Sequence, residues 1–355
     1  MRKVALILVA VAMLFALAAC GTNDPAPVSA PEPAPAPAPE PAPAPAPEPA
    51  PAPAPAPTDG PIRVAIINNP PSESGYREAN VKDMTDIFTA ANGYEVQSFY
   101  DQEHDPQITA ARGFIADGVD YLLISAAAET GWDAVLQDAK DAGIGIFLFD
   151  RMITTNLFDA AVVSDMHNQG KMAIEVLEGL GLPEYNIIHI QGQMGSAAQV
   201  GRTEPFMAHV GANANWNIVV QQTASWDPDT AKQIVESVIA SGDSFNVVYA
   251  ENDGMAAGAV AALDDAGITH GINADGSLRD VVIIGVDANR WALRELLDGN
   301  WNFNIQCSPF QAQIIHEMIQ GTRSYSPGEV IINPERYFDA RNITEAEIAQ
   351  FGLGD

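Results

Sequence analysis

The feature that most constrains this chain is a series of short apolar runs that alternate with amphipathic stretches from residue 62 onwards. The run Ile144–Phe149 is apolar throughout, which indicates a strand covered on both faces, as in parallel sheets. Strands are expected at residues 62–68, 94–100, 121–125, 145–150, 160–164, 186–191, 217–222, 246–251 and 281–287. This alternation predicts an α/β fold with doubly wound parallel sheets and helices on both faces.

The stretches between the strands carry signals of helix boundaries. Thr130 and Asp133 have the spacing of a capping box, and Gly143 and Gly267 stand where helices should end. In open α/β sheets of this kind, ligands bind outside the carboxyl ends of the strands. The residues at those ends are therefore the first candidates for a functional site.

The amino terminus predicts export from the cytoplasm. Arg2 and Lys3 precede a short apolar segment that ends in LAAC at Cys20, which resembles a bacterial lipobox and implies cleavage before Cys20 and lipid attachment. An uncleaved membrane anchor is the alternative, although the apolar stretch is short for a span. Residues 1–20 are expected to be a lipoprotein signal peptide, and residues 21–60 a Pro/Ala-rich stalk in extended polyproline conformations. The protein is then lipid-anchored to the bacterial membrane, in a periplasm or at the outer surface.

Composition limits the classes of partner. The formal net charge of -29 argues against nucleic acid or an anionic lipid surface as a ligand, because both require a basic protein surface. The 295 residues after residue 60 (355 less 60) suffice for about two domains. With Cys20 committed to lipid, Cys307 is the only remaining thiol, so no intramolecular disulfide is expected and Cys307 is predicted to pack in the core.

Acids, amides and arginines collect at the ends of the predicted strands. They are Asp150, Arg151, Arg202, Asn252, Asp253 and Asp287. Taken singly, each charged residue could simply close a strand with a salt bridge. Because the carboxyl ends of parallel strands meet at one edge of a sheet, their collection predicts a ligand-binding cleft.

The residue types at these ends suit a sugar. Aspartate accepts hydrogen bonds, asparagine both donates and accepts, and arginine donates two at once, which together match vicinal hydroxyl groups. Tyr76, Trp132 and Trp226 are candidate aromatic faces for the apolar side of a sugar ring, with core packing as the alternative for each.

Five motifs carry a family resemblance: SESGYR, ETGWDAVLQDAKDAGIGIFLFDR, IIHIQGQMGSAAQVGR, VVYAENDGM and GVDA. In this order they resemble the type I periplasmic sugar-binding proteins of bacterial ABC importers, in the ribose/galactose-binding family, and most closely its galactofuranose-binding members. The resemblance extends from Ile62 to about Gln306.

The resemblance implies a set of sugar-binding residues. It assigns ring stacking to Tyr76 and Trp226, and places Arg77 beside the residues that bind hydroxyl groups. Those hydroxyl partners are Asp150, Arg151, Arg202, Asn252, Asp253, Asp287 and Gln306. The galactofuranose-binding members have Trp at the position of Tyr76 and Glu at that of Gln306.

The resemblance also implies two lobes joined by a hinge of three crossovers, near Ser164, Gln306 and residues 325–332. The N-terminal lobe is then residues 61–164 plus 307–325, and the C-terminal lobe is residues 165–306 plus 326–355. Such a protein is a monomer without a cofactor that captures a neutral monosaccharide by hinge closure. It then delivers the sugar to the membrane permease of an ABC importer.

Enzymatic and metal-dependent alternatives have weaker support. A glycosidase needs a pair of carboxylates, which Asp150, Asp253 and Asp287 could supply, but neighbouring arginines keep such acids ionised, whereas a general acid needs a raised pKa. The six histidines show no pairing typical of a metal site, and GQMGS lacks the Lys of a phosphate-binding loop. We therefore expect neither catalysis nor a bound metal.

Two alternatives within the binding proteins stay open from sequence. A sugar sensor that docks on a chemoreceptor or a histidine kinase would use the same binding residues. Arg77, Arg151 and Arg202 could instead serve an anionic ligand such as a sugar acid or an amino acid, although the acids of the same cleft would repel a carboxylate.

Overall fold

A computed structural model describes residues 60–354 of the chain. The predicted signal peptide, the predicted lipid attachment at Cys20 and almost all of the predicted stalk lie outside the described residues. Within residues 60–354, no helix is both long enough and apolar enough to cross a membrane.

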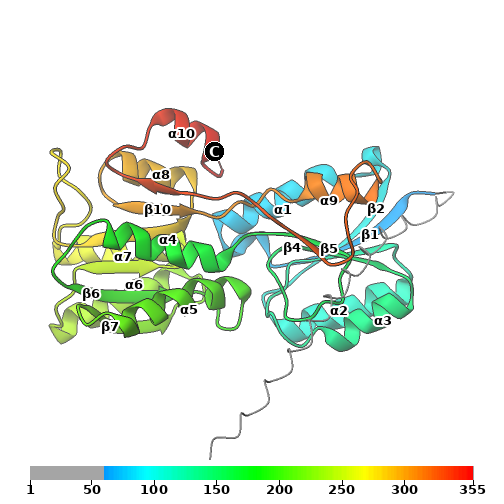
Figure 1. The fold of residues 1–355 in the computed structure, drawn as a ribbon, viewed down its shortest axis with the longest axis horizontal. Helices are drawn as coiled ribbons and strands as arrows, with labels where there is room; N and C mark the ends of the chain where they lie inside the picture. The colour runs from blue at the N-terminus through cyan, green and yellow to red at the C-terminus, as the bar shows by residue number, and fades with distance from the viewer. Residues whose placement is uncertain (1–59, 355) are drawn as a thin grey trace, which may run out of the picture. The chain divides into compact units, whose positions relative to one another are not determined.

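The first sheet contains six strands, all parallel, in the order β11-β5-β4-β3-β1-β2. Its strands are β1 (Ile62–Asn68), β2 (Tyr94–Tyr100), β3 (Tyr121–Ile124), β4 (Gly145–Asp150), β5 (Ala160–Val163) and β11 (Glu329–Ile332). Its helices are α1 (Gly75–Ile87), α2 (His104–Asp117), α3 (Asp133–Asp141) and α9 (Ala312–Ile319), with short 3₁₀ turns η1 (Pro71–Glu73) and η2 (Ala90–Asn92). Helices α1 and α9 cover one face of the sheet, and α2 and α3 cover the other (Figure 1). We call this sheet and its helices the first lobe.

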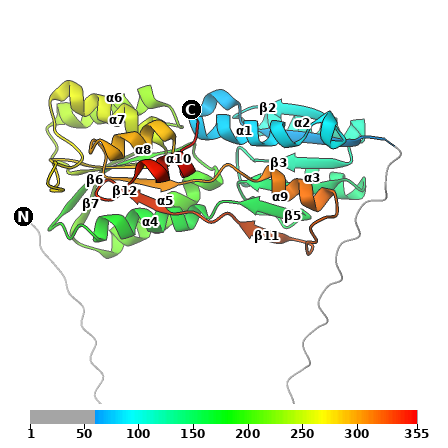
Figure 2. The same ribbon diagram turned by 90° about the horizontal axis from the view of Figure 1, so that it is seen from above.

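The second sheet also contains six strands, in the order β12-β10-β9-β8-β6-β7, and β12 alone among them runs antiparallel to its neighbour. Its strands are β6 (Tyr185–Gln191), β7 (Trp216–Thr223), β8 (Val247–Ala250), β9 (Val282–Asp287), β10 (Phe303–Gln306) and β12 (Tyr337–Asp339). Its helices are α4 (Met166–Glu178), α5 (Ala197–Ala212), α6 (Pro228–Ser241), α7 (Asp253–Ala266), α8 (Arg290–Leu297) and α10 (Glu345–Phe351). Helices α4 and α5 lie below the sheet and α6, α7 and α8 above it in Figure 2. We call this sheet and its helices the second lobe.

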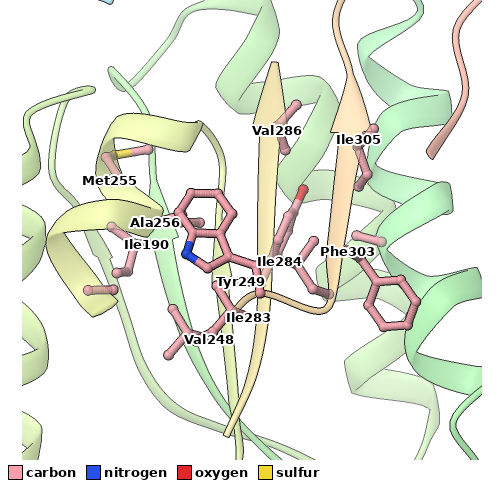
Figure 3. Packing of buried hydrophobic residues seen from close by; sticks show 14 of the residues in the cluster. Ile190, Val248, Tyr249, Met255, Ala256, Ile283, Ile284, Val286, Phe303 and Ile305 are labelled. Carbon is pink, nitrogen blue, oxygen red and sulfur yellow. The ribbon is translucent and has the colours of Figure 1, made fainter. Parts of the chain in front are cut away.

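Each sheet is buried on both faces, as the apolar strands predicted. Strand β4 is completely buried from Ile146 to Phe149, and β9 is buried along its whole length. In the second lobe, side chains of β8, β9 and β10 pack together with Met255 and Ala256 of α7 (Figure 3). Burying one such aliphatic side chain contributes roughly 1.5–3 kcal/mol to folding. Because many such side chains are buried, the two sheets are stable supports for the residues at their edges.

The local signals were only partly correct. Gly267 ends α7 in the left-handed conformation and Gly143 follows α3 with a φ of 76°, as expected. The predicted capping box is wrong, because Gly131, with a φ of 89°, separates Thr130 from the helix and Trp132 takes the N-cap position without a side-chain cap bond. Pro205 lies inside α5, which continues through it.

The chain passes between the lobes three times, at residues 164–165, 307–311 and 333–336. The third crossover differs from the expectation that residues 326–355 all belong to the second lobe. Strand β11 pairs in parallel with β5 of the first sheet, with Ile332 opposite Val163, so the crossing comes after this strand. Because β11 is an edge strand, alternate side chains such as Val330 and Ile332 stay exposed, and its short sequence gave no clear signal for either sheet.

Candidate functional site

The carboxyl ends of both sheets border one small cavity. Its empty space, open solvent included, measures about 280 Å³. It is lined by Glu73, Ser74, Tyr76, Asp150, Arg151, Met166, Ala198, Arg202, Trp226, Asn252, Asp287 and Cys307. Both lobes and the second crossover therefore contribute to the wall.

Asp150 forms the centre of the wall on the first lobe. Its carboxylate accepts hydrogen bonds from Tyr76 Oη at 2.7 Å and Ser125 Oγ at 2.8 Å, and Arg77 Nη2 lies 2.8 Å from Oδ2. Burial raises the pKa of Asp150, but the charges of Arg77 and Arg151 outweigh it, so the pKa lies below its usual value. Asp150 also has a φ of 65°, a conformation that aspartate tolerates better than most residues and that turns the chain at the end of β4.

Glu73 supports the same wall from the turn η1. Its carboxylate accepts a hydrogen bond from Arg77 Nε at 3.0 Å and another from Asn69 Nδ2 at 2.6 Å. Ser74 is the N-cap of α1 and accepts a hydrogen bond from the backbone N–H of Arg77. The loop after β1 thus fixes the start of α1, which presents Tyr76 to the cavity and Arg77 to the acids.

Arg151 is held more loosely than the residues around it. Its Nη2 lies 3.8 Å from Glu73 Oε1, its Nε lies 3.6 Å from Asp150 Oδ2, and its Nη1 donates to the carbonyl of Ala126 at 3.4 Å. Its buried Nε has no hydrogen-bond partner within the described chain. A buried donor without a partner is costly, so this atom suits an acceptor brought by a ligand.

Arg202 reaches the cavity from α5 of the second lobe. Its Nε donates to Gln169 Oε1 at 2.8 Å, and its Nη1 donates to the carbonyl oxygen of Glu251. The guanidinium carbons of Arg202 and Arg151 each lie 5.8 Å from the ring centroid of Trp226. Arginines from both lobes therefore approach the same indole.

Trp226 occupies a strained turn after β7. Ser225 and Trp226 have φ values of 52° and 72°, which side chains rarely adopt. The indole packs on Gly192, where an added Cβ would stand 1.8 Å from a ring carbon, so only glycine fits there. Trp226 Nε1 is buried without a partner in the described chain, like Arg151 Nε.

Two acids of the second lobe differ from Asp150. Asp253 is enclosed by amides, since it accepts hydrogen bonds from the backbone N–H of Asn289 at 2.8 Å, from Asn289 Nδ2 at 3.0 Å and from Asn304 Nδ2 at 2.5 Å. Asp287 ends β9 with a φ of 122°, and its Oδ1 lies 3.9 Å from Arg202 Nη2. Burial raises the pKa of Asp253 to about 7 and, together with repulsion from Asp253, raises that of Asp287 well above its usual value.

The lobes also meet through residues that do not line the cavity. Gln193 Nε2 of the second lobe donates to the carbonyl of Gln102 at 2.7 Å, and the backbone N–H of Glu129 donates to the carbonyl of Gly195 at 3.2 Å. Gly75 of α1 lies against Asn289, where an added Cβ would stand 2.2 Å from Asn289 Oδ1. These contacts join the two lobes directly, apart from the crossovers.

Most of the residues expected from sequence come together here, with exceptions. Those lining the cavity are Tyr76, Asp150, Arg151, Arg202, Trp226, Asn252 and Asp287. Arg77, Asp253 and Gln306 are not among the lining residues. The backbone N–H of Gln306 donates a hydrogen bond to the carbonyl of Arg336. Trp132 packs in the core of the first lobe and donates from Nε1 to the carbonyl of Ala128. The role of these residues in sugar binding stays a prediction.

Sequence reasoning missed several lining residues. They are Glu73, Ser74, Met166, Ala198 and Cys307. Glu73 was visible in the polar loop after the first predicted strand, but nothing in its spacing distinguished it from a solvated acid. Cys307 is buried as expected of a core residue, and it also borders the cavity. Among residues 60–354, no group of three or more His, Cys, Asp and Glu side chains could hold a metal ion.

Comparison with known proteins agrees with this geometry. Residues 64–319 match the family model of the periplasmic binding protein domain. The galactofuranose-binding protein YtfQ of Escherichia coli is 31% identical over 219 residues, which cover 59% of this chain and 66% of that protein. The fructose import binding protein FruE of Bifidobacterium longum is 28% identical over 288 residues, which cover 77% of this chain and 84% of that protein. The crystal structure of a galactofuranose-binding protein superposes with a TM-score of 0.73 at 25% identity and covers 82% of this chain and 98% of its own.

Proposed function

This chain belongs to the family of periplasmic binding proteins, which bind solutes and are not enzymes, and we propose that it captures one neutral monosaccharide between its lobes for an ABC importer. It is a sugar-binding protein of the importer type, as its relatives are. The proposal concerns the ligand within that class, the route of delivery and the anchoring of the protein. The ring form that we propose is a furanose such as galactofuranose.

The observation that carries this proposal is the pair of unsatisfied donors in the cavity. Arg151 Nε and Trp226 Nε1 are buried, belong to different lobes and lack partners in the described chain. A ligand that offers acceptor oxygens to both would satisfy them only when the lobes are closed. The hydroxyl oxygens of a sugar are acceptors of this kind, and they also donate to acids such as Asp287.

The balance of charge favours a neutral ligand over an anion. The acids that line the cavity are Glu73, Asp150 and Asp287, and the arginines that line it are Arg151 and Arg202. Arg77 lies behind the wall and pairs with two of these acids. Opposite charges of nearly equal number leave no net attraction for a carboxylate, whereas hydroxyl groups can bind to both signs.

The size of the cavity favours a single sugar ring. Its empty space is only about 280 Å³ even with open solvent included, which argues against an oligosaccharide. The face of Trp226 offers a surface for the apolar side of the ring. Similarity to two proteins named for galactofuranose supports the furanose form in particular.

Capture follows from the arrangement of the lobes. A sugar that contacts both walls stabilises the closed state, because only that state supplies both half-sites. The closed lobes then present a surface for the permease to recognise. Lipid attachment at Cys20 and a stalk over residues 21–60 would hold the body at the membrane, outside the cytoplasm.

A thermal-shift and calorimetry panel tests this proposal. The panel contains D-galactose, L-arabinose, D-fructose, D-ribose, galacturonate and glutamate, each with the purified full chain. A sugar at a hundred times its dissociation constant should stabilise the protein by about 2.7 kcal/mol, and the two anions should give no shift. Binding of an anion alone, or of nothing in the panel, would overturn the proposal.

A matched pair of arginine variants locates the site. Arg151→Gln removes the guanidinium whose Nε has no partner within the described residues, so affinity for the best sugar should fall by about tenfold or more. Arg112→Gln, on the exposed face of α2, removes the same charge far from the cavity lining and should leave affinity unchanged. Equal affinities for the two variants would mean that the sugar binds elsewhere.

A further inference from the structure

A single carboxylate, that of Glu335, touches all three crossovers between the lobes. Glu335 belongs to the third crossover, and its Oε1 accepts hydrogen bonds from Ser164 Oγ at 2.6 Å and from the backbone N–H of Ser308 at 2.9 Å. Ser164 belongs to the first crossover and Ser308 to the second. Rotation of the lobes about these segments therefore cannot leave the surroundings of Glu335 unchanged.

The other oxygen of Glu335 leads to the cavity. Oε2 accepts a hydrogen bond from Gln169 Nε2 at 2.7 Å, and Gln169 Oε1 accepts one from Arg202 Nε at 2.8 Å. Gln169 is completely buried, and Arg202 lines the cavity. One amide thus connects the hinge to an arginine of the site.

The neighbouring glycine makes this connection possible. Gly170 lies so close to α5 that an added Cβ would stand 2.5 Å from the carbonyl oxygen of Arg202. Helices α4 and α5 consequently approach each other closely at this level, and the side chain of Gln169 can span the gap to Arg202. The contact is built into the packing of the two helices and does not depend on a long, exposed side chain.

The chemistry of the three groups fixes the direction of the amide. An ionised carboxylate only accepts hydrogen bonds and a guanidinium only donates them, whereas an amide has one end of each kind. Gln169 must therefore turn its NH₂ group to Glu335 and its oxygen to Arg202. A neutral side chain at position 335 that can also donate hydrogen bonds would no longer require the NH₂ group of Gln169 to face it. The Gln169 amide could then rotate by half a turn.

We infer that Glu335 is a positioning residue that joins the three crossovers and, through Gln169, holds Arg202 in the orientation that binds ligand. This inference rests on the proposed function, since it assigns Arg202 to the sugar site. It makes affinity depend on a residue that lines no part of the cavity. The arrangement also gives a route by which closure of the hinge and formation of the site occur together.

An exchange of amide and acid between the two positions tests the inference. Glu335→Gln places two NH₂ groups against each other, and Gln169→Glu places two carboxylates against each other, so each variant should bind sugar about tenfold more weakly or worse. The double variant Glu335→Gln with Gln169→Glu restores a donor facing an acceptor at every contact. Its affinity should return to within about threefold of that of the wild type.

The measurements are calorimetric titrations with D-galactose, or with the panel sugar that the wild type binds most tightly, and thermal melts without ligand. Glu178→Gln, at the exposed end of α4, is the matched control for loss of one charge and should bind normally. If the single Glu335 variant does not fold, Ser164→Ala removes one hydrogen bond to Glu335 and should still weaken binding by severalfold.

Two results would overturn the inference. The first is single variants that fold and bind as tightly as the wild type, whatever their melting temperatures. The second is a double variant as weak as the single ones, because rescue is what distinguishes a directional contact from general damage. Failure of the wild type to bind any sugar would instead overturn the proposed function, and the two failures are therefore distinguishable.

Discussion

Asp150 and Asp287 occupy matching places in the two lobes but differ in their surroundings. Each ends the third strand from one edge of its sheet, each is almost completely buried, and each has a positive φ. Asp150 is bonded by Tyr76 and Ser125 and pairs with Arg77, whereas Asp287 has a 3.9 Å contact with Arg202. The pKa of Asp150 is lowered and that of Asp287 is raised.

This difference shows that the two walls are prepared for a ligand to different degrees. On the first lobe, contacts within the protein hold Asp150 and Arg77 in place, whereas Arg151 Nε has no hydrogen-bond partner within the described residues. On the second lobe, within residues 60–354, Asp287 is buried without close partners for its charge, and Trp226 Nε1 has no acceptor. We infer that a ligand adds little to the environment of Asp150 but completes that of Asp287.

The largest expected effect is the loss of stability in Asp150→Ala. Removing this carboxylate leaves Arg77, which is completely buried, with one acid partner fewer. Breaking a buried pair of this kind costs about 3–5 kcal/mol, so the melting temperature without ligand should fall sharply. Binding by the protein that still folds should weaken as well, because Tyr76 loses the acceptor that fixes its hydroxyl group.

Differential scanning calorimetry without ligand, followed by titration of the folded fraction, separates the two effects. Asp227→Ala, which removes an exposed N-cap of α6, controls for loss of an acid and should cost only about 1 kcal/mol. A variant Asp150→Ala with unchanged stability would contradict the view that contacts within the protein hold Asp150 in place without ligand.

The sequence placed both aspartates correctly at the ends of strands but could not distinguish them. Unbroken apolar runs fixed the strands and hence the edge at which Asp150 and Asp287 meet the cavity. Their partners come from distant parts of the chain, such as the segment at residues 73–77 and helix α5. Contacts between residues so far apart in the sequence produce no recognisable local sequence pattern. The positive φ values at both ends are set by tertiary packing, which local propensity does not reveal.

Physical causes also explain why some predicted site residues do not line the cavity. Gln306 and Cys307 are neighbours at the end of β10, where successive side chains point in opposite directions, and it is Cys307 that lines the cavity. The neighbours Asn252 and Asp253 at the start of α7 also face different surroundings. Asn252 lines the cavity, whereas Asp253 accepts a hydrogen bond from Asn304 Nδ2. In both pairs, which of two adjacent side chains faces the cavity depends on a shift of one residue along the chain. The pattern of apolar residues in the sequence does not determine that shift.

A smaller effect is expected from Trp226→Phe. Phenylalanine keeps an aromatic face on Gly192 but removes the unsatisfied Nε1, so stability without ligand should be unchanged or slightly higher. Affinity for the sugar should fall by about fivefold to tenfold if a ligand oxygen accepts from that atom. Trp132→Phe, in the core of the first lobe, is the control and should lower stability without changing affinity. If the Trp226→Phe variant binds the sugar with wild-type affinity, the indole N–H does not donate a hydrogen bond to the sugar.

The last effect is a dependence of stability on pH that belongs to Asp253 and Asp287 and not to Asp150. Burial raises the pKa of Asp253 to about 7 and raises that of Asp287, so both acids bind protons more tightly in the folded chain than in the unfolded chain. Stability from these groups is therefore greatest below their unfolded pKa of about 3.9 and is lost as pH rises through the folded values. The pKa of Asp150 is lowered, so its contribution is present above the unfolded value and disappears only in stronger acid.

Between pH 8 and pH 5 the ligand-free wild type should therefore gain about 5 °C or more in melting temperature on acidification. Part of this gain comes from neutralising a chain of net charge -29, which acts on every variant alike. Asp287→Asn removes one titrating group and the repulsion that it shares with Asp253, so its melting temperature should depend less on pH over the same interval. Melts of both proteins at matched ionic strength measure the difference, and parallel pH profiles would mean that Asp287 is already ionised and satisfied before any ligand binds.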